Sequence, residues 1–475
     1  MPAMRRRDFL GRMESAAAAG VLGLTGRLPV ELAGELTGSA AAQAPGERPT
    51  QAADVVVLNP ATRVPVSFII DDSTCLVNLN RFAMPQFDDA FGGKNKTFAR
   101  DWRSWPVEIP DSFVRTFGTW CAEHGVKGKY SIVPYPACVG RLDRGLPGWT
   151  QRELADSIEL VRTLMVPNWD IHPELITHTR VIDLATGHPY ADHSTRFMEN
   201  WEWTTGRSAD ELAAYLAYAL RILQNVGLPS EGVTTPGGFG AKARPELSLA
   251  VGQAVRDVYK ADIPHYFRDA VVTGPGSVAP RVENARDLDG SDPRCVVSVV
   301  ACTDDGFGGW DATPPGGVDK FITADLKSGR MVEVIERGDV AVMMSHWTGI
   351  YWNGQELGFK VFQEVVRRLH ARFDNLVWMK LSEIARYAAA RTLTRIEAAG
   401  GRVEFRAPFA CPAFTVRVPP SAGNAAPRFH AAGVDRPPLT RVERPLDLSA
   451  GKWCDTRDGR VICVDLPRGR SELTR

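Results

Sequence analysis

The chain has 475 residues, and its 56 Lys and Arg balance its 56 Asp and Glu, so the formal net charge is zero. This balance argues against nucleic acid or another polyanion as a partner held by bulk electrostatics. The length indicates one large domain with a smaller one, and beyond the amino-terminal segment no apolar run approaches the roughly 20 residues that cross a bilayer. We therefore expect no membrane span in the mature protein.

The amino terminus resembles a twin-arginine export signal. Arg6-Arg7-Asp8-Phe9-Leu10 is followed by an apolar stretch over 16–24 and by Ala42-Gln43-Ala44, a tripeptide that suits signal peptidase. We expect residues 1–44 to engage the twin-arginine export machinery and to be removed. The mature protein would then reside in the periplasm or outside the cell.

Segments typical of strands and of helices alternate from about residue 53 to residue 391, which indicates parallel strands joined by helices. The expected strands are apolar and rich in β-branched residues, and they cover 64–70, 130–133, 169–176, 233–235, 295–301, 340–344 and 376–379. Apolar residues at helical spacing predict helices over 113–121 and 359–373. Two capping boxes, Thr150-x-x-Glu153 and Ser208-x-x-Glu211, predict two further helix starts.

The pattern changes at residue 392, where short β-type runs over 403–405, 414–418 and 460–464 are separated by Pro and Gly. We expect a small all-β appendage there. Asp458-Gly459 suits the turn of a hairpin, and this register would place Cys454 opposite Cys463 and allow a disulfide bridge. The eight cysteines form no C-x-x-C pair, so a thiolate zinc site is not expected.

Polar residues follow the apolar strands, and in a barrel of parallel strands the loops at the carboxyl ends converge on one site. In chain order these residues are Asp71-Asp72, Glu174 with His178, Thr234 to Gly238, Asp304-Asp305, and His346. The series resembles the ordered motifs of the NodB-type polysaccharide deacetylases over roughly residues 60–390. The resemblance implies a (β/α)7-type distorted TIM barrel over 45–391, with the small β-rich domain over 392–475.

Asp71-Asp72 at the end of an apolar strand resembles the first motif of that family. The resemblance implies that Asp71 is the general base and that Asp72 is a metal ligand. Adjacent side chains of a strand point to opposite sides, so one carboxylate can bind a cation while the other meets the water bound to it. The alternative is a solvated turn or a helix cap.

The second family motif, H-x-x-x-H, is matched only if Glu174 replaces its first histidine and His178 is its second. Asp72, Glu174 and His178 would then hold a divalent metal, with zinc as the first expectation, and the oxygen-rich set also admits other divalent ions. His172 is a rival ligand. Alternatively, His172 and His178 form a hydrogen-bonded pair that lines a neutral pocket.

The later motifs are matched in part. Thr234 stands where the family has an arginine that orients the base, and Asp305 with Trp310 is similar to a later Asp and Trp motif with different spacing. His346 ends an apolar strand as in the last motif, which implies the general acid that protonates the leaving group, a role that suits a pKa near neutrality. Its neighbour Trp347 would stack on a sugar or belong to the core. The expected substrate-binding residues are His172, Asp305, Trp310 and Trp347.

These matches predict a metal-dependent hydrolase that removes an acyl group, as amide or ester, from a carbohydrate-like substrate. One alternative is an altered barrel that serves as an exported glycan-binding protein, consistent with the missing arginine and with twelve tryptophans. Another is a glycosidase with paired carboxylates such as Asp72 and Glu202. Bound metal distinguishes the first hypothesis from the other two.

Overall fold

The computed structural model describes residues 46–72, 75–420, 425–431 and 438–474. The export signal expected over residues 1–44 lies outside the described residues. Within the described ranges, no helix combines the length and the apolar character that crossing a membrane requires.

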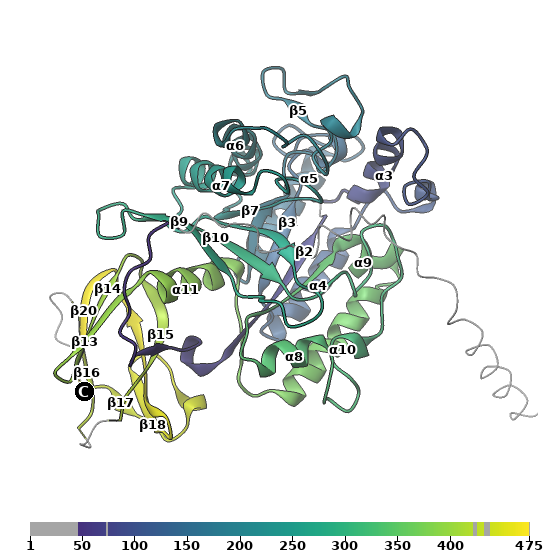
Figure 1. The fold of residues 1–475 in the computed structure, drawn as a ribbon. Coiled ribbons are helices and arrows are strands. Elements are labelled where there is room, and N and C mark those ends of the chain that lie inside the picture. The colour runs from purple at the N-terminus through teal and green to yellow at the C-terminus, as the bar shows by residue number, and fades with distance from the viewer. Residues whose placement is uncertain (1–45, 73–74, 421–424, 432–437, 475) are drawn as a thin grey trace, which may run out of the picture.

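Parallel strands form two sheets at the centre of the larger part of the molecule (Figure 1). In one sheet the order is β11-β2-β3-β4, and β12 also pairs with β2; in the other it is β7-β8-β10, with β9 antiparallel at the edge. The bounds of these strands are β2 Val64–Asp71, β3 Gly128–Ile132, β4 Trp169–Pro173, β7 Gly232–Thr234, β8 His265–Ala270, β9 Arg281–Arg286, β10 Arg294–Ala301, β11 Ala341–His346 and β12 Leu376–Trp378.

Helices connect the strands and lie outside the two sheets. They are α3 Leu79–Ala90, α4 Asp111–Glu123, α5 Gln151–Leu160, α6 Ala209–Asn225, α7 Arg244–Tyr259, α8 Arg330–Glu336, α9 Trp347–Tyr351, α10 Leu357–Arg372 and α11 Leu381–Leu393. Both predicted capping boxes are confirmed: Thr150 caps α5 with Glu153, and Ser208 caps α6 with Glu211. A short two-stranded sheet, β5 Ile182–Asp183 and β6 His188–Pro189, precedes α6.

Main-chain contacts link the two parallel sheets to each other. Glu174 and Thr234 form a parallel bridge that joins the end of β4 to β7. The amide of Cys302, directly after β10, donates a hydrogen bond of 2.7 Å to the carbonyl of Val342 on β11. The expectation of a mixed α/β fold with parallel strands is confirmed, whereas the closed (β/α)7 barrel stays a prediction.

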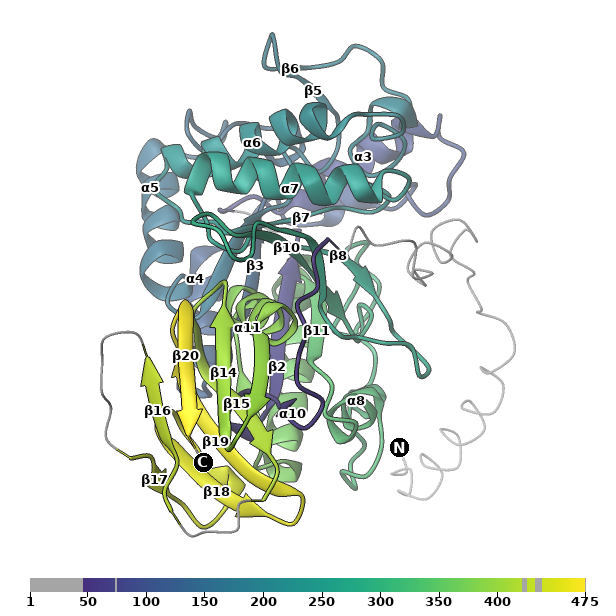
Figure 2. The same ribbon diagram turned by 60° about the vertical axis from the view of Figure 1, so that its left-hand side comes forward.

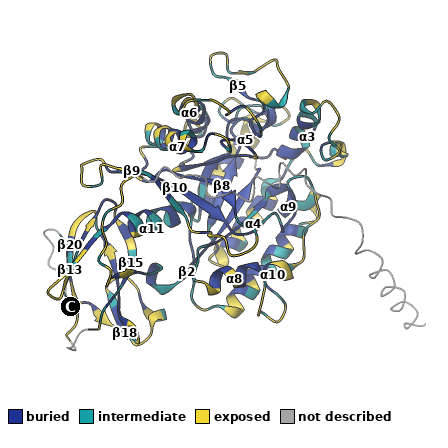
Figure 3. Cartoon of the chain, in the orientation of Figure 1, coloured by how far each residue is buried: buried dark blue, intermediate teal, exposed yellow. Residues whose placement is uncertain are grey.

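Each strand buries one apolar face and one partly polar face, because successive side chains alternate. Phe68, Tyr130 and Ile171 belong to the core that packs against the helices. The alternate positions carry polar groups instead, including Ser131 and His172, which are also buried. The central parallel strands are mostly dark in Figure 3, where many of the exposed residues lie on the outer helices and loops. A polar set is thereby enclosed between the strands.

After α11, the described residues form strands and one short 3-10 helix, arranged in two sheets (Figure 2). Their orders are β1-β15-β19-β18-β17 and β13-β14-β20-β16. The bounds are β1 Val56–Val57, β13 Arg395–Ala399, β14 Arg402–Ala407, β15 Cys411–Val418, β16 Arg428–Ala431, β17 Thr440–Arg441, β18 Lys452–Thr456, β19 Gly459–Leu466 and β20 Gly469–Thr474. Because β1 comes from the start of the described chain, the amino-terminal segment completes a sheet made by the carboxyl-terminal residues. The domain limits given above remain a prediction.

The expected bridge between Cys454 and Cys463 is wrong, because the hairpin has a different register. Thr456 pairs with Gly459, so Cys454 faces Val461, and both cysteines are free thiols. Gly459 does not lie at the centre of the turn. A Cβ atom there would come within 2.3 Å of the Val418 carbonyl oxygen, so this glycine allows β15 to approach β19 closely.

Candidate metal and active site

The predicted site residues lie at the carboxyl ends of the parallel strands, where the loops of such sheets converge. Asp71 is the last residue of β2, and Asp72 follows it. Glu174 follows β4 directly, and His346 ends β11. Since β11 pairs with β2 and His346 lies opposite Asp71, residues far apart in the chain share one edge of the sheet.

Asp72, Glu174 and His178 form a buried cluster, and their potential ligand atoms all lie within 4.8 Å of one another. His178 Nε2 is 2.6 Å from Asp72 Oδ1 and 3.4 Å from Glu174 Oε1. The Asp72 amide donates a hydrogen bond of 2.9 Å to Glu174 Oε2, which fixes the second carboxylate beside the first. The fold therefore brings together the three residues expected to hold a metal.

This cluster fits a divalent cation. Despite its short contact with His178, the buried Asp72 Oδ1 has no hydrogen bond of good geometry among the described residues. Two carboxylates with one imidazole are ligands that zinc accepts. The negative charge also acts on His178: burial would lower its pKa, but Asp72 and Glu174 raise it well above the ordinary value. A proton on His178 thus supplies the positive charge that a bound cation would supply.

The ligand loop after β4 is held in an uncommon conformation. Leu175 and His178 have φ angles of 57° and 62°, and left-handed backbone at such residues costs on the order of 1–3 kcal/mol. The buried carboxylate of Glu199 stabilises this loop, because it accepts hydrogen bonds from three consecutive backbone amides and from the Tyr215 hydroxyl, at 2.6 Å. Those amides belong to Ile176, Thr177 and His178.

Asp71, the expected base, contacts two polar side chains of the neighbouring strand β3. Its Oδ1 forms an ion pair with Lys129 Nζ and accepts a hydrogen bond of 2.9 Å from Ser131 Oγ. Burial raises the pKa of Asp71 to about 6, although the Lys129 ammonium opposes this rise. Such a pKa suits a group that takes up a proton near neutral pH.

His346, the expected acid, lies between two carboxylates. Its Nδ1 is 2.7 Å from Asp305 Oδ2, and its Nε2 is 3.9 Å from Asp72 Oδ2. Burial opposes protonation, but Asp305 and Asp72 outweigh it and raise the pKa of His346 to about 10. The imidazole therefore holds a proton at neutral pH, and Asp305 orients the ring.

Asp305 also connects the expected substrate residue Trp310 to this site, because the Trp310 amide donates to Asp305 Oδ2 at 3.1 Å. The Trp310 ring is half-buried and packs 6.0 Å from the ring of Phe87, which lies 6.5 Å from His178. Trp201 contacts the same Phe87 at 5.1 Å and is also half-buried. Two half-buried tryptophans thus pack on Phe87, which lies next to His178.

Trp347 does not offer a surface to substrate, so that expectation is corrected. Its side chain is buried, with 1% of its surface exposed, and it packs 5.1 Å from Tyr130 and 5.3 Å from Phe117. The residue begins α9, which turns its ring inward to the core rather than outward from the strand end. Of the two roles considered for it, the structure supports the one in the core.

His172 is not a rival ligand at the metal cluster, nor does it pair with His178. It is fully buried, and its Nε2 lies 3.0 Å from the Nε2 of His265 at the start of β8. The two rings fit together because Gly232 carries no side chain: a Cβ atom there would come within 2.6 Å of His172 Nε2. Burial lowers the pKa of both histidines, that of His265 to about 4, so the pair is neutral.

Asp170, His172 and His265 also lie close enough together to be considered for a cation. However, Asp170 accepts hydrogen bonds from the Ser382 amide at 2.6 Å and hydroxyl at 2.8 Å, and Lys380 lies 3.7 Å away. The Nε2 atoms of His172 and His265 form a hydrogen bond with each other. This group is therefore an internal hydrogen-bonded cluster.

Sequence reasoning missed Lys129, His265 and Glu199. The first two lie on strands, and alternation with buried apolar neighbours is the signal that could have placed them on the same enclosed face as Asp71. The strand β8 was itself not predicted. Glu199 lies in a loop, and no sequence pattern marks its contacts with the ligand loop.

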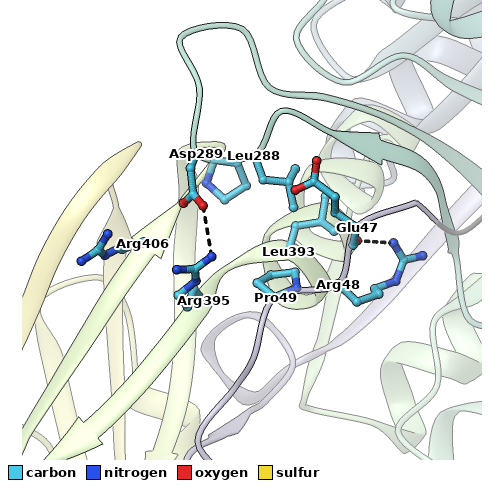
Figure 4. A pocket seen from close by; sticks show the side chains of 9 residues that line it. Glu47, Arg48, Pro49, Leu288, Asp289, Leu393, Arg395 and Arg406 are labelled. Atoms are coloured by element: carbon cyan, nitrogen blue, oxygen red, sulfur yellow. Dashed lines mark hydrogen bonds and ion pairs between the residues drawn. The ribbon is translucent and has the colours of Figure 1, made fainter.

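Cavities also open away from the predicted site. One of about 220 Å³ opens where the amino-terminal segment, the β9–β10 loop and the β13–β14 strands meet (Figure 4), and Arg395 crosses it to reach Asp289. None of the predicted site residues lines it. Asp72, Glu174 and His178 are buried, whereas the neighbouring His346 and Asp305 have 13% and 25% of their side chains exposed.

Comparisons with known proteins assign no activity to this chain. No family model and no curated protein matches it. Twelve chains of solved structures match, among them a probable polysaccharide deacetylase from Pseudomonas aeruginosa PAO1, at 12% identity and a TM-score of 0.36, over 68% of this chain and 90% of the other. A 4-alpha-glucanotransferase from Thermococcus litoralis matches at 10% identity and a TM-score of 0.33, over 68% and 40%. The endo-glycoceramidase II from Rhodococcus sp. matches at 8% identity and a TM-score of 0.27, over 88% and 99%.

Proposed function

We propose that this protein is a metal-dependent hydrolase that removes an acyl group from a carbohydrate-like substrate. The observation that carries the proposal is the convergence of five groups at one edge of the parallel strands. Three of them, Asp72, Glu174 and His178, are close enough to share a cation. The other two are a buried carboxylate, Asp71, and a protonated imidazole, His346, which are paired residues of the adjacent strands β2 and β11.

Asp72, Glu174 and His178 would hold the divalent ion, with zinc as the first candidate. When bound, such an ion polarises the acyl carbonyl and acidifies water. Asp71 accepts the proton of the attacking water. His346 Nε2 donates its proton to the leaving nitrogen or oxygen as the bond to the acyl carbon breaks, and Asp305 stabilises the imidazole in the orientation that this transfer needs.

The proposed scaffold is a distorted seven-stranded (β/α) barrel with a small β-rich domain at its carboxyl terminus. The bridge between Glu174 and Thr234 and the hydrogen bond from Cys302 to Val342 support it, since they link the two parallel sheets at two places. We also propose that the protein is exported by the twin-arginine pathway, on the strength of the motif that begins at Arg6.

The test combines metal analysis with hydrolysis of 4-nitrophenyl acetate and of acetylated chito-oligosaccharides. The wild type should retain about one equivalent of metal, and Asp72→Ala and His178→Ala should each lose it while keeping their secondary structure. His188→Ala, which removes an exposed histidine on β6, is the matched control. Equal metal content in all four proteins, or full hydrolysis after chelation, would contradict the proposal.

A glycan-binding protein is the second candidate, and the partly exposed side chains of Trp201 and Trp310, which pack on Phe87 next to His178, favour it. It predicts binding of the oligosaccharides without acyl release or metal. The glycosidase is not favoured, because Glu202 is exposed and accepts a hydrogen bond from Thr195, whereas Asp72 is buried within the metal cluster.

A further inference from the structure

Lys129 is a charged residue in the middle of the fold. It lies on β3, none of its side chain is exposed, and a lysine is rarely buried unless it is paired. Its ammonium forms an ion pair with Asp71 Oδ1 and donates a hydrogen bond of 2.6 Å to Ser131 Oγ. Since removing an ammonium from water costs several kcal/mol, this position is retained at a cost to the fold.

The side chains of Lys129, Ser131 and Asp71 all contact one another. Lys129 and Ser131 are alternate residues of β3 and therefore project to the same side, and both donate to Oδ1 of Asp71. The ring of Phe267 on β8 lies 5.6 Å from the ammonium and restricts it further. The Oδ1 atom of the Asp71 carboxylate is thus fixed by two donors of β3.

The neighbouring strands offer no replacement for this cation. Thr234, at the end of β7, is neutral, and its hydroxyl lies 3.4 Å from His172 Nδ1. His178 and His346 are engaged by the carboxylates of Asp72, Glu174 and Asp305. Lys129 is therefore the cation that faces Asp71 at contact distance.

We propose that Lys129, assisted by Ser131, is the positioning residue of this site: it holds Asp71 Oδ1 so that Oδ2 faces the water from which Asp71 takes a proton. The inference rests on the proposed function, in which Asp71 is the base. Lys129 acts through Asp71 alone, because it is fully buried below the strand end and does not reach substrate.

The test is a double-mutant cycle between Lys129→Met and Asp71→Asn in zinc-loaded protein, with 4-nitrophenyl acetate as the probe. Lys129→Met should lower kcat at least tenfold, with KM and zinc content unchanged. In the Asp71→Asn background the same substitution should cause no further loss of kcat. It should also restore thermal stability relative to either single variant, because the neutral pair leaves no buried charge unpaired.

Ser131→Ala serves if Lys129→Met folds poorly, since it removes one donor and keeps the ion pair. It should lower kcat severalfold with zinc content unchanged. A wild-type kcat in folded, zinc-loaded Lys129→Met or Ser131→Ala, or equal losses in both backgrounds of the cycle, would overturn the inference alone. Absence of hydrolysis by zinc-loaded wild type would overturn the proposed function and this inference with it.

Discussion

At the scale of single residues, His346 illustrates how neighbours decide a role. An isolated imidazole is half-protonated near pH 6.5, but the carboxylates of Asp305 and Asp72 raise the pKa of this one to about 10. It is therefore charged in the resting site and can deliver a proton. Its contact with Asp72 at 3.9 Å also places it next to the metal cluster without making it a member.

We expect His346→Ala to lower the turnover of an acetamide substrate by about 10²- to 10⁴-fold, the usual contribution of a positioned acid. Metal content should stay at the wild-type level. The loss should be smaller with 4-nitrophenyl acetate, whose leaving group departs without protonation. Kinetics and metal analysis of the same preparations decide the matter, and loss of metal together with activity would make His346 a ligand instead.

The residues that end strands could be predicted from sequence, because a polar group directly after an apolar run lies where a strand leaves the core and its loop begins. Asp71, Asp72, Glu174, His178 and His346 were predicted in this way, and the structure brings them together. The aromatic neighbour Trp347 could not be assigned, since a residue one position further on begins a helix and turns inward. Sequence spacing does not reveal that turn.

At the scale of elements, the loop from Leu175 to His178 depends on one carboxylate. Glu199 accepts hydrogen bonds from three backbone amides of this loop, and burial raises its pKa to about 7. These hydrogen bonds stabilise the left-handed backbone of His178, and the side chain of this residue belongs to the metal cluster.

We expect Glu199→Gln to weaken zinc affinity by about 10- to 100-fold, the usual effect of removing a group that orients a metal ligand. In the variant, the side-chain NH₂ group of glutamine would face backbone N–H groups, and two donors cannot form a hydrogen bond. In the wild type these N–H groups donate to the carboxylate of Glu199. Zinc titration by calorimetry measures the effect, with Glu202→Gln as control because that glutamate is exposed. Equal affinities in the two variants would show that the loop holds its shape unaided.

The buried pair of His172 and His265 should make stability depend on pH. Burial lowers the pKa of His265 from 6.5 to about 4, so between these values the unfolded chain binds a proton that the folded chain does not. The free energy of unfolding is therefore highest above pH 6.5, where His265 is neutral in both states, and it decreases as the pH falls from 6.5 towards 4. At about 1.4 kcal/mol per pKa unit, this decrease reaches about 3 kcal/mol.

Urea unfolding of wild type and His265→Gln at several pH values checks this expectation. The glutamine offers a hydrogen-bond partner to His172 but does not titrate. The wild type should lose stability more steeply between pH 6.5 and 4, whereas the other charged or titratable groups of this cluster, His172, Asp170 and Lys380, are common to both proteins. Parallel profiles would mean that His265 is protonated in the folded state.

Most central elements could be predicted, because their apolar runs are long and their helix starts carry capping boxes. The strand β8 was missed, since His265, Arg268 and Asp269 interrupt its apolar pattern. The β18–β19 hairpin was given the wrong register for a related reason: Gly459 suits a turn by its type, but it is used for close approach to Val418. Local composition does not distinguish these two uses.

At the scale of the whole molecule, Tyr387 of α11 joins the two parts of the structure. Its hydroxyl donates a hydrogen bond of 2.7 Å to the Leu58 carbonyl and accepts one of 3.2 Å from the Thr415 amide. It thereby connects the helix after the last parallel strand with both the amino-terminal segment and β15. Figure 2 shows α11 between the parallel strands and the carboxyl-terminal sheets.

We expect Tyr387→Phe to lower the free energy of unfolding by about 1–3 kcal/mol, because a buried amide and a carbonyl lose their partner. Urea denaturation measures this change. Tyr190→Phe is the control, since that side chain is exposed. Similar stability of both variants would indicate that packing alone holds the two parts together.

The pairing of β1 with β15 has a consequence for how the chain is synthesised. Val57 leaves the ribosome long before its partner Val416 is made. Until then the apolar side chains of Val55 and Val57 have no cover, and closing so long a loop is entropically unfavourable. A chain that is truncated or stalled before β15 cannot pair this segment. The segment then remains exposed to proteases and chaperones. The edge strand β1 can therefore pair only after β15 has been synthesised.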